Sequence, residues 1–215
     1  MREYIISMLL SLPIILLVIS VHETAHGYVA SKLGDPTAKS LGRLTLNPLK
    51  HIDPIGFICM ILCGFGWAKP VPINTRYFKK PRRDMALTGA AGPVSNLLMA
   101  VVFTLLYRLA FGILSGIPFS DIRTYTIALY FLKFLNTGVV LNVAFAVFNL
   151  LPIPPFDGSR VFYSFLPPKF YFGVMKYEQY ISLGLMFLLI LGVLDPILSF
   201  FTDNIVSLLF RLIWF

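Results

Sequence analysis

The sequence predicts an all-α protein that crosses a membrane several times. Hydrophobic residues make up 57% of the chain and charged residues only 13%, about half the charged share of an ordinary soluble domain. The mean hydropathy is +0.80. The apolar residues form long blocks and do not alternate with polar ones, a pattern typical of membrane-spanning helices.

We expect about five transmembrane helices, the first three of which form the core of the protein. The expected helices cover residues 3–33, 85–114, 123–151, 177–194 and 197–213. Gly34 and Pro36 end the first helix. Asp195-Pro196 separates the last two blocks, which alternatively form one broken hairpin that does not fully cross the membrane.

The segment 55–74 is expected to enter the membrane without crossing it. Its apolar part is too short to span, and Gly64, Gly66, Pro70 and Pro72 break it. Such irregular backbone is tolerated at membrane depth only where protein shields it or where it lines a wet cavity. We therefore predict a re-entrant loop or a β-hairpin segment here.

The basic residues predict how the chain is oriented. Ten Lys and Arg residues but only three acids lie from Lys32 to Asp84, so the positive-inside rule places this loop in the cytoplasm and the N-terminus outside. The formal net charge is +8, and most of it sits in loops between apolar blocks. This placement indicates contact with lipid headgroups and not with nucleic acid.

Two histidines and a glutamate interrupt the first apolar block, in the stretch "VHETAHG". Residues four apart share one face of a helix, so His22 and His26 can bind one ion, while Glu23 lies beside that face, placed to hold a water molecule. This H-E-x-x-H arrangement is that of zinc hydrolases, whose glutamate is a general base. The alternative is a pair of packed histidines, but burying three ionisable groups in a membrane without an ion would cost several kcal/mol.

A third zinc ligand is expected at Asp157, in "NLLPIPPFDG" directly after the third helix. Two histidines leave a tetrahedral zinc ion one protein ligand short if the fourth position is open to water. Three prolines end the helix and Gly158 permits a tight turn, so we expect the carboxylate on unwound backbone at the same cytoplasmic end as the histidines. The alternative is a plain Asp-Gly turn.

Three motifs together resemble the site-2 protease family of intramembrane zinc metalloproteases. They are "HETAH" in the first helix, "GPVSN" (Gly92 to Asn96) in the second and "NLLPIPPFDG" (Asn149 to Gly158) after the third. The loops "LGRLTLNPLKHIDPIG" and "GWAKPVPIN" also resemble those of compact members, and the match covers about residues 18–160.

The resemblance implies one Zn²⁺ per chain, bound by His22, His26 and Asp157, with Glu23 as the catalytic base. Asn149 matches an asparagine of the family motif, which implies a hydrogen bond to the substrate or the transition state. The implied domain organisation is a catalytic core over residues 1–160, followed by C-terminal membrane helices over 161–215, with no PDZ or CBS domain.

The implied function is hydrolysis of peptide bonds in transmembrane substrates near the cytoplasmic side, in regulated intramembrane proteolysis. Family analogy offers single-pass membrane proteins as substrates: anti-sigma factors, transcription-factor precursors or remnant signal peptides. The implied location is the cell membrane of a bacterium or archaeon, with the active site toward the cytoplasm. Whether the protein forms a homo-oligomer is left open by the sequence.

Two other functions compete with proteolysis. A membrane metal transporter could use the same histidines and aspartate as a transit site, but it has no need of a glutamate after the first ligand, and the chain shows no repeated halves. An inactive protease-like scaffold would not need the complete set of ligands and base.

Other polar and flexible positions have a structural interpretation, and some also have a functional one. The segment "CGFGWAKPVP" is either a surface on which an unwound substrate docks as an added strand or a purely structural loop. For His51 and Asp53 we expect hydrogen bonds within their loop. For Asn96 and Asn142 we expect a structural role across helices, with orientation of the histidines as the alternative.

Overall fold

The computed structural model describes residues 2–63, 66–119, 121–167, 173 and 176–214, and this part of the chain is helical, without a strand. The predicted all-α membrane fold is confirmed. Four of the described helices are long and apolar enough to cross a membrane.

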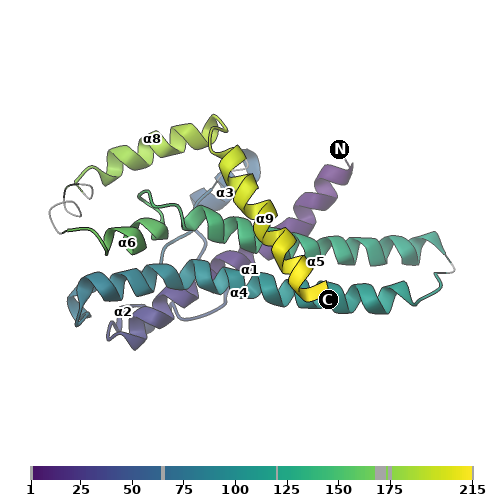
Figure 1. The fold of residues 1–215 in the computed structure, drawn as a ribbon, viewed down its shortest axis with the longest axis horizontal. Helices are drawn as coiled ribbons and strands as arrows, with labels where there is room; N and C mark the ends of the chain where they lie inside the picture. The colour runs from purple at the N-terminus through teal and green to yellow at the C-terminus, as the bar shows by residue number, and fades with distance from the viewer. Residues whose placement is uncertain (1, 64–65, 120, 168–172, 174–175, 215) are drawn as a thin grey trace.

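Three long helices form the core: α1 (Arg2–Lys32), α4 (Pro81–Ser115) and α5 (Ile122–Asn149). In Figure 1, α4 and α5 run side by side along the long axis of the molecule and α1 crosses behind them. All three lie within a few residues of their predicted bounds. The largest difference is the start of α4, where Pro81 extends the helix by a turn because a proline at the first helical position loses no hydrogen bond.

Close packing joins α4 to α5. A Cβ atom on Gly138 would lie 2.3 Å from the ring of Phe103, so the two helices meet where one of them has no side chain. Phe103, Leu135 and Val139 are buried there. This contact fixes the two helices that flank α1.

The C-terminal helices differ in length from the prediction. Helix α9 (Asp195–Trp214) is long enough to span, and it packs across α5 and α4 (Figure 1). Helix α8 (Glu178–Ile190) has only 13 residues, or about 20 Å, against a hydrocarbon core of about 30 Å. The described residues therefore contain four helices of spanning length instead of about five. The division at residue 160 stays a prediction.

In its described residues, the segment between α1 and α4 forms four short helices: α2 (Thr37–Ser40), η1 (Pro48–Lys50), α3 (Pro54–Cys63) and η2 (Thr75–Tyr77). The ten residues of α3 are too few to span, as expected for a re-entrant segment. No β-hairpin forms in the described residues, although Ile52 and Ala68 make one isolated antiparallel bridge. Gly64 lies outside the described residues.

Residues 68–74, here called the strap, lie against α1 and are held at both ends. The backbone N–H of Lys69 donates to the His51 carbonyl at 2.8 Å. At the other end, the N–H of Asn74 donates to the carboxylate of Asp35 at 2.7 Å, and Asp35 is fully buried. The strap is therefore fixed relative to the helix that carries both histidines.

The predicted loop roles of His51 and Asp53 are confirmed. The His51 Nε2 atom lies 2.7 Å from the Thr45 carbonyl and donates to it. The Asp53 carboxylate accepts from the backbone N–H groups of Ile55 and Gly56 at the start of α3.

Candidate metal centre

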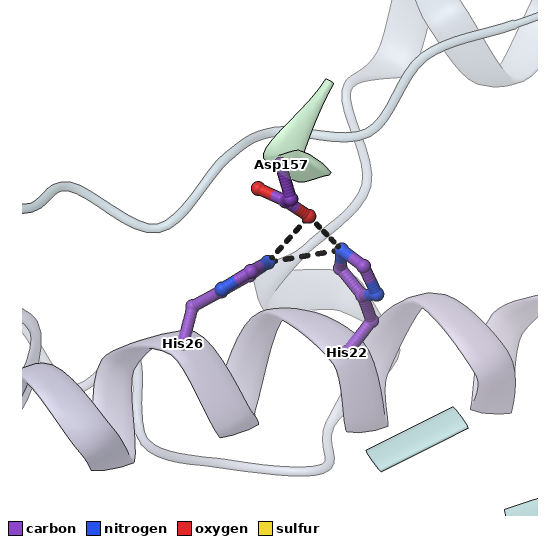
Figure 2. A group of neighbouring side chains, drawn as sticks. All are labelled: His22, His26 and Asp157. Carbon is purple, nitrogen blue, oxygen red and sulfur yellow. Dashed lines mark hydrogen bonds and ion pairs between the residues drawn. The ribbon is translucent and has the colours of Figure 1, made fainter. Parts of the chain in front are cut away.

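The structure brings His22, His26 and Asp157 together at one point. Figure 2 shows both imidazoles rising from one side of α1 and the carboxylate reaching them from above. Asp157 Oδ2 lies 3.0 Å from His22 Nε2 and 3.1 Å from His26 Nε2, and the two nitrogens are 2.9 Å apart. In the described part of the chain, these three residues are a set whose ligand atoms can share a metal ion.

Both imidazoles are held from behind by oxygen atoms of α4. His22 Nδ1 lies 2.7 Å from the side-chain oxygen of Asn96, and His26 Nδ1 lies 2.7 Å from the backbone carbonyl of Thr88. These oxygens only accept hydrogen bonds, so each Nδ1 carries the proton and each Nε2 presents its lone pair to the centre.

The donor set therefore fits zinc. Two Nε2 lone pairs and a carboxylate oxygen converge within about 3 Å of one another, an arrangement in which the three acceptors repel one another unless a cation lies between them. Two imidazoles and one carboxylate are the protein ligands of zinc hydrolases that keep one position open. The oxygens of Asn96 and Thr88 accept the hydrogen bonds from Nδ1 that fix the orientation of histidine ligands in metal sites.

Asp157 is placed differently from the prediction. It is the first residue of a short helix, α6 (Asp157–Tyr163), and not part of a tight turn on unwound backbone. Gly158 is needed for a close contact: its Cβ would lie 2.2 Å from the carbonyl oxygen of Leu150. The chain thus folds tightly back on the end of α5, and this contact sets the position of the carboxylate.

Gly92 makes room for the imidazoles. A Cβ atom at this position would lie 2.4 Å from His26 Nε2 and 2.5 Å from His22 Cε1, distances that real Cβ atoms do not reach. Thr88, Gly92 and Asn96 are spaced by four residues, so one face of α4 presents an acceptor, a gap and a second acceptor to the two histidines. In the sequence this glycine stands out only as part of a motif, which does not reveal this role.

Glu23 lies beside the metal centre and not in it, as predicted. One oxygen of its carboxylate accepts the backbone N–H of Val71, in the strap, at 2.7 Å. Val71 is the only residue of Pro70-Val71-Pro72 that has an N–H group. This backbone donor, which no side-chain pattern reveals, was also missed.

Two cavities meet at the centre, with volumes of about 210 Å³ and 500 Å³. Both are lined by His22, Glu23, Pro70, Asn149, Pro155 and Arg160. The larger cavity extends to α8 and is also lined by Phe145 and Phe148. His22 and Glu23 therefore face both cavities, whereas His26 and Asp157 line the smaller one.

Asn149 and Arg160 are the other polar side chains in both cavities. The Asn149 amide donates one hydrogen to the carbonyl of Phe145 at 2.9 Å, which leaves a second hydrogen for a ligand. Arg160, which the sequence analysis did not single out, packs its stem near Gly89. Its guanidinium makes no hydrogen bond or ion pair with the described residues.

Asn96 shows both of the interpretations that the sequence offered. Its side chain bonds across helices to Val18 and Asn142, as expected of a structural residue, and its oxygen also lies 2.7 Å from His22 Nδ1 and so orients that ring. Asn142 bonds to Asn96 across the helices, as expected of a structural residue.

Comparisons with known proteins indicate a family of peptidases. Residues 10–192 match the family described as "Peptidase family M50". "Putative zinc metalloprotease YwhC" of Bacillus subtilis is 42% identical over 203 residues, which cover 91% of this chain and 89% of the relative.

Two more distant relatives carry similar names. "Putative zinc metalloprotease Rip2" of Mycolicibacterium smegmatis is 30% identical over 84% of this chain and 66% of its own length. "Zinc metalloprotease MJ0392" of Methanocaldococcus jannaschii is 27% identical over 75% of this chain and 36% of its own length. No solved structure matches the chain significantly.

Proposed function

Because the chain belongs to peptidase family M50, the site-2 protease family, we propose that it cuts peptide bonds of membrane-spanning substrates near the cytoplasmic side of the membrane. The family and the named relatives make the chain a zinc metalloprotease. The proposal adds where the enzyme cuts and which residues do the work.

The proposed zinc ligands are His22, His26 and Asp157. The observation that carries this proposal is the convergence of three acceptor atoms from α1 and α6. On the far side of each imidazole, the Nδ1 proton is hydrogen-bonded to an oxygen of α4. Zinc bound there supplies a Lewis acid that activates water and polarises the peptide carbonyl.

Glu23 is the proposed general base. The Val71 N–H holds one of its carboxylate oxygens, which leaves the other free to take a proton from water and pass it to the leaving amine. Asn149 can donate its second amide hydrogen to the carbonyl oxygen as negative charge develops there. One such donor is worth about 3 kcal/mol in other hydrolases.

Single-pass membrane proteins are the proposed substrates. Four helices of spanning length indicate a lipid bilayer as the environment, and a substrate held there would be helical. Its carbonyls are bonded internally, so a segment must unwind before attack. Gly66 and the strap border the larger cavity, which supports docking of the unwound segment at this surface.

The basic loop supports cleavage near the cytoplasmic side. His26 is six residues before Lys32, or about 9 Å along a helix, so the metal centre lies below the membrane surface on the side where the Lys and Arg residues gather. Neither alternative, a metal transporter or an inactive scaffold, is favoured by an observation in the described structure.

The test compares the purified protein with Glu23→Gln and His22→Ala, each assayed for bound zinc and for cleavage of a single-span substrate in vesicles. We expect zinc in the wild type and in Glu23→Gln, cleavage by the wild type alone, and neither property in His22→Ala. Cleavage by Glu23→Gln, or an equal zinc content in His22→Ala, would contradict the assigned roles.

A further inference from the structure

Asn142, on α5, is fully buried, and the hydrogen bonds of its side chain among the described residues do not include the proposed zinc ligands. A buried amide costs free energy unless all of its hydrogen-bonding groups find partners. Among the described residues, the side chain of Asn142 bonds only to Gly138 and Asn96. These two bonds point to a role in holding the metal centre.

The direction of the Asn142 amide is set by its own helix. Its nitrogen donates to the Gly138 carbonyl at 2.8 Å, and a carbonyl can only accept. The Asn142 oxygen must therefore face the other way, toward Asn96.

Asn96 is in turn fixed by two acceptors. Its amide nitrogen donates to the Asn142 oxygen and to the Val18 carbonyl, each at 3.2 Å. If the Asn96 amide were reversed, its oxygen would face two other oxygens. The Asn96 oxygen is thereby turned to His22 Nδ1, 2.7 Å away.

The chain of bonds ends at the proton on His22. Because the Asn96 oxygen only accepts, His22 must carry its proton on Nδ1, which leaves the Nε2 lone pair facing Asp157 and His26. The opposite tautomer would place a hydrogen where a metal ion must bind.

We propose that Asn142 is a positioning residue for zinc, which acts through Asn96 to fix the tautomer and the direction of the His22 ring. This inference rests on His22 being a zinc ligand, as proposed above. According to this proposal, the zinc affinity of the histidines on α1 depends on how α5 packs against α4.

The test measures the zinc dissociation constant by competition with a chelator, in the full-length protein in detergent micelles. Asn96→Leu should weaken zinc binding by about 10-fold to 100-fold, the usual effect of losing a group behind a metal ligand. Asn142→Leu should weaken it by about tenfold, because the Val18 carbonyl still holds Asn96.

The double variant separates positioning from general destabilisation. If Asn142 acts through Asn96, the Asn142→Leu change adds nothing to the zinc affinity of Asn96→Leu. Thr104→Val is the matched control, since Thr104 is also fully buried in the core and bonds only its own helix, at Ala100. It should leave zinc affinity unchanged.

Asn142→Asp is the conservative variant. A neutral aspartic acid can donate to Gly138 and accept from Asn96, so this variant should bind zinc within about threefold of the wild type. It also keeps the proposal testable if Asn142→Leu fails to fold, because a tenfold loss in Asn142→Asp would then count against positioning by hydrogen bonds.

A second measurement does not involve the metal. Nitrogen NMR of ¹⁵N-histidine-labelled, zinc-free protein should show His22 protonated at Nδ1 in the wild type and a new Nε2-protonated population in Asn142→Leu. The proposal would be overturned if Asn142→Leu left the tautomer or the zinc affinity unchanged. It would also be overturned if Asn142→Leu lowered the zinc affinity equally in the wild type and in Asn96→Leu. If His22→Ala keeps its zinc, the proposed ligand set fails instead, so the two failures are distinguishable.

Discussion

Single atoms of α4 decide how the two histidines face the metal centre. The carbonyl of Thr88 and the side-chain oxygen of Asn96 accept the two ring protons, and Gly92 between them leaves room for both rings. The four-residue spacing of these positions matches the spacing of the histidines, so one helix face serves both rings. A side chain between the two acceptors should therefore be as damaging as the loss of a ligand.

Gly92→Ala should abolish zinc binding. Its Cβ would overlap both imidazoles, so the rings must turn away or the helices must separate. Bound zinc in the purified variant, measured by elemental analysis, should fall at least tenfold, and cleavage should fall with it.

The matched control is Gly112→Ala, in the same helix. A Cβ there meets nothing within 4 Å, and alanine is the better helix former by about 1 kcal/mol. This variant should keep its zinc and be at least as stable as the wild type. Full zinc loading in Gly92→Ala would show that α4 can move away at little cost.

Among the elements, the strap and the short helix α6 position the chemistry, while α4 and α5 provide the rigid support. The strap delivers the Val71 N–H to Glu23, and α6 begins with Asp157 because three prolines and a tight contact at Gly158 end α5 there. Neither element is long enough to be stable alone. Their positions depend on the bonds at their ends.

Gly66 tests whether the strap side of the larger cavity takes the substrate. If an unwound segment docks there, Gly66→Val should lower cleavage of a single-span substrate at least tenfold, because a branched side chain would prevent close approach of the backbone. Zinc content should not change, since Gly66 is not a ligand.

Gly66→Ala provides the graded comparison, with a smaller loss expected. Normal cleavage by a well-expressed, zinc-loaded Gly66→Val protein would favour the purely structural interpretation of this loop. A loss of zinc in Gly66→Val would show that the substitution disturbs the centre itself.

At the scale of the whole molecule, the metal centre lies where α1, α4 and α6 meet, and the described structure offers access to it through the two cavities. Burial of His22 and His26 strengthens the interactions between charges at the centre. The basic residues on one side of the long helices predict which side of the membrane this centre faces.

Orientation can be tested by labelling single cysteines on intact cells with a membrane-impermeant maleimide, after Cys59 and Cys63 are replaced by alanine. Ile117→Cys, in the exposed turn after α4, should react from outside. Lys39→Cys, in the basic loop, should react only after the membrane is opened. The reverse pattern would place the active site on the outer side.

The amino-acid sequence was enough to predict the apolar helices, the pair of histidines with Glu23 beside them, and Asp157 as the candidate third ligand. These features depend on local periodicity and on the cost of charge in a membrane, which can be estimated from residue types and spacing. The "GPVSN" motif contains Gly92 and Asn96: orientation of a histidine was one of two interpretations of Asn96, but the role of Gly92 could not be read from the motif.

The contacts that position the side chains of the candidate metal centre became visible only in the folded chain. The Thr88 carbonyl and the Val71 N–H are backbone groups, which every residue type except proline has in full, so no side-chain pattern marks them. The path from Asn142 through Asn96 to His22 joins three helices, and Asp157 is placed by a contact at Gly158. Such contacts depend on how the helices pack, because residues distant in the chain become neighbours only then.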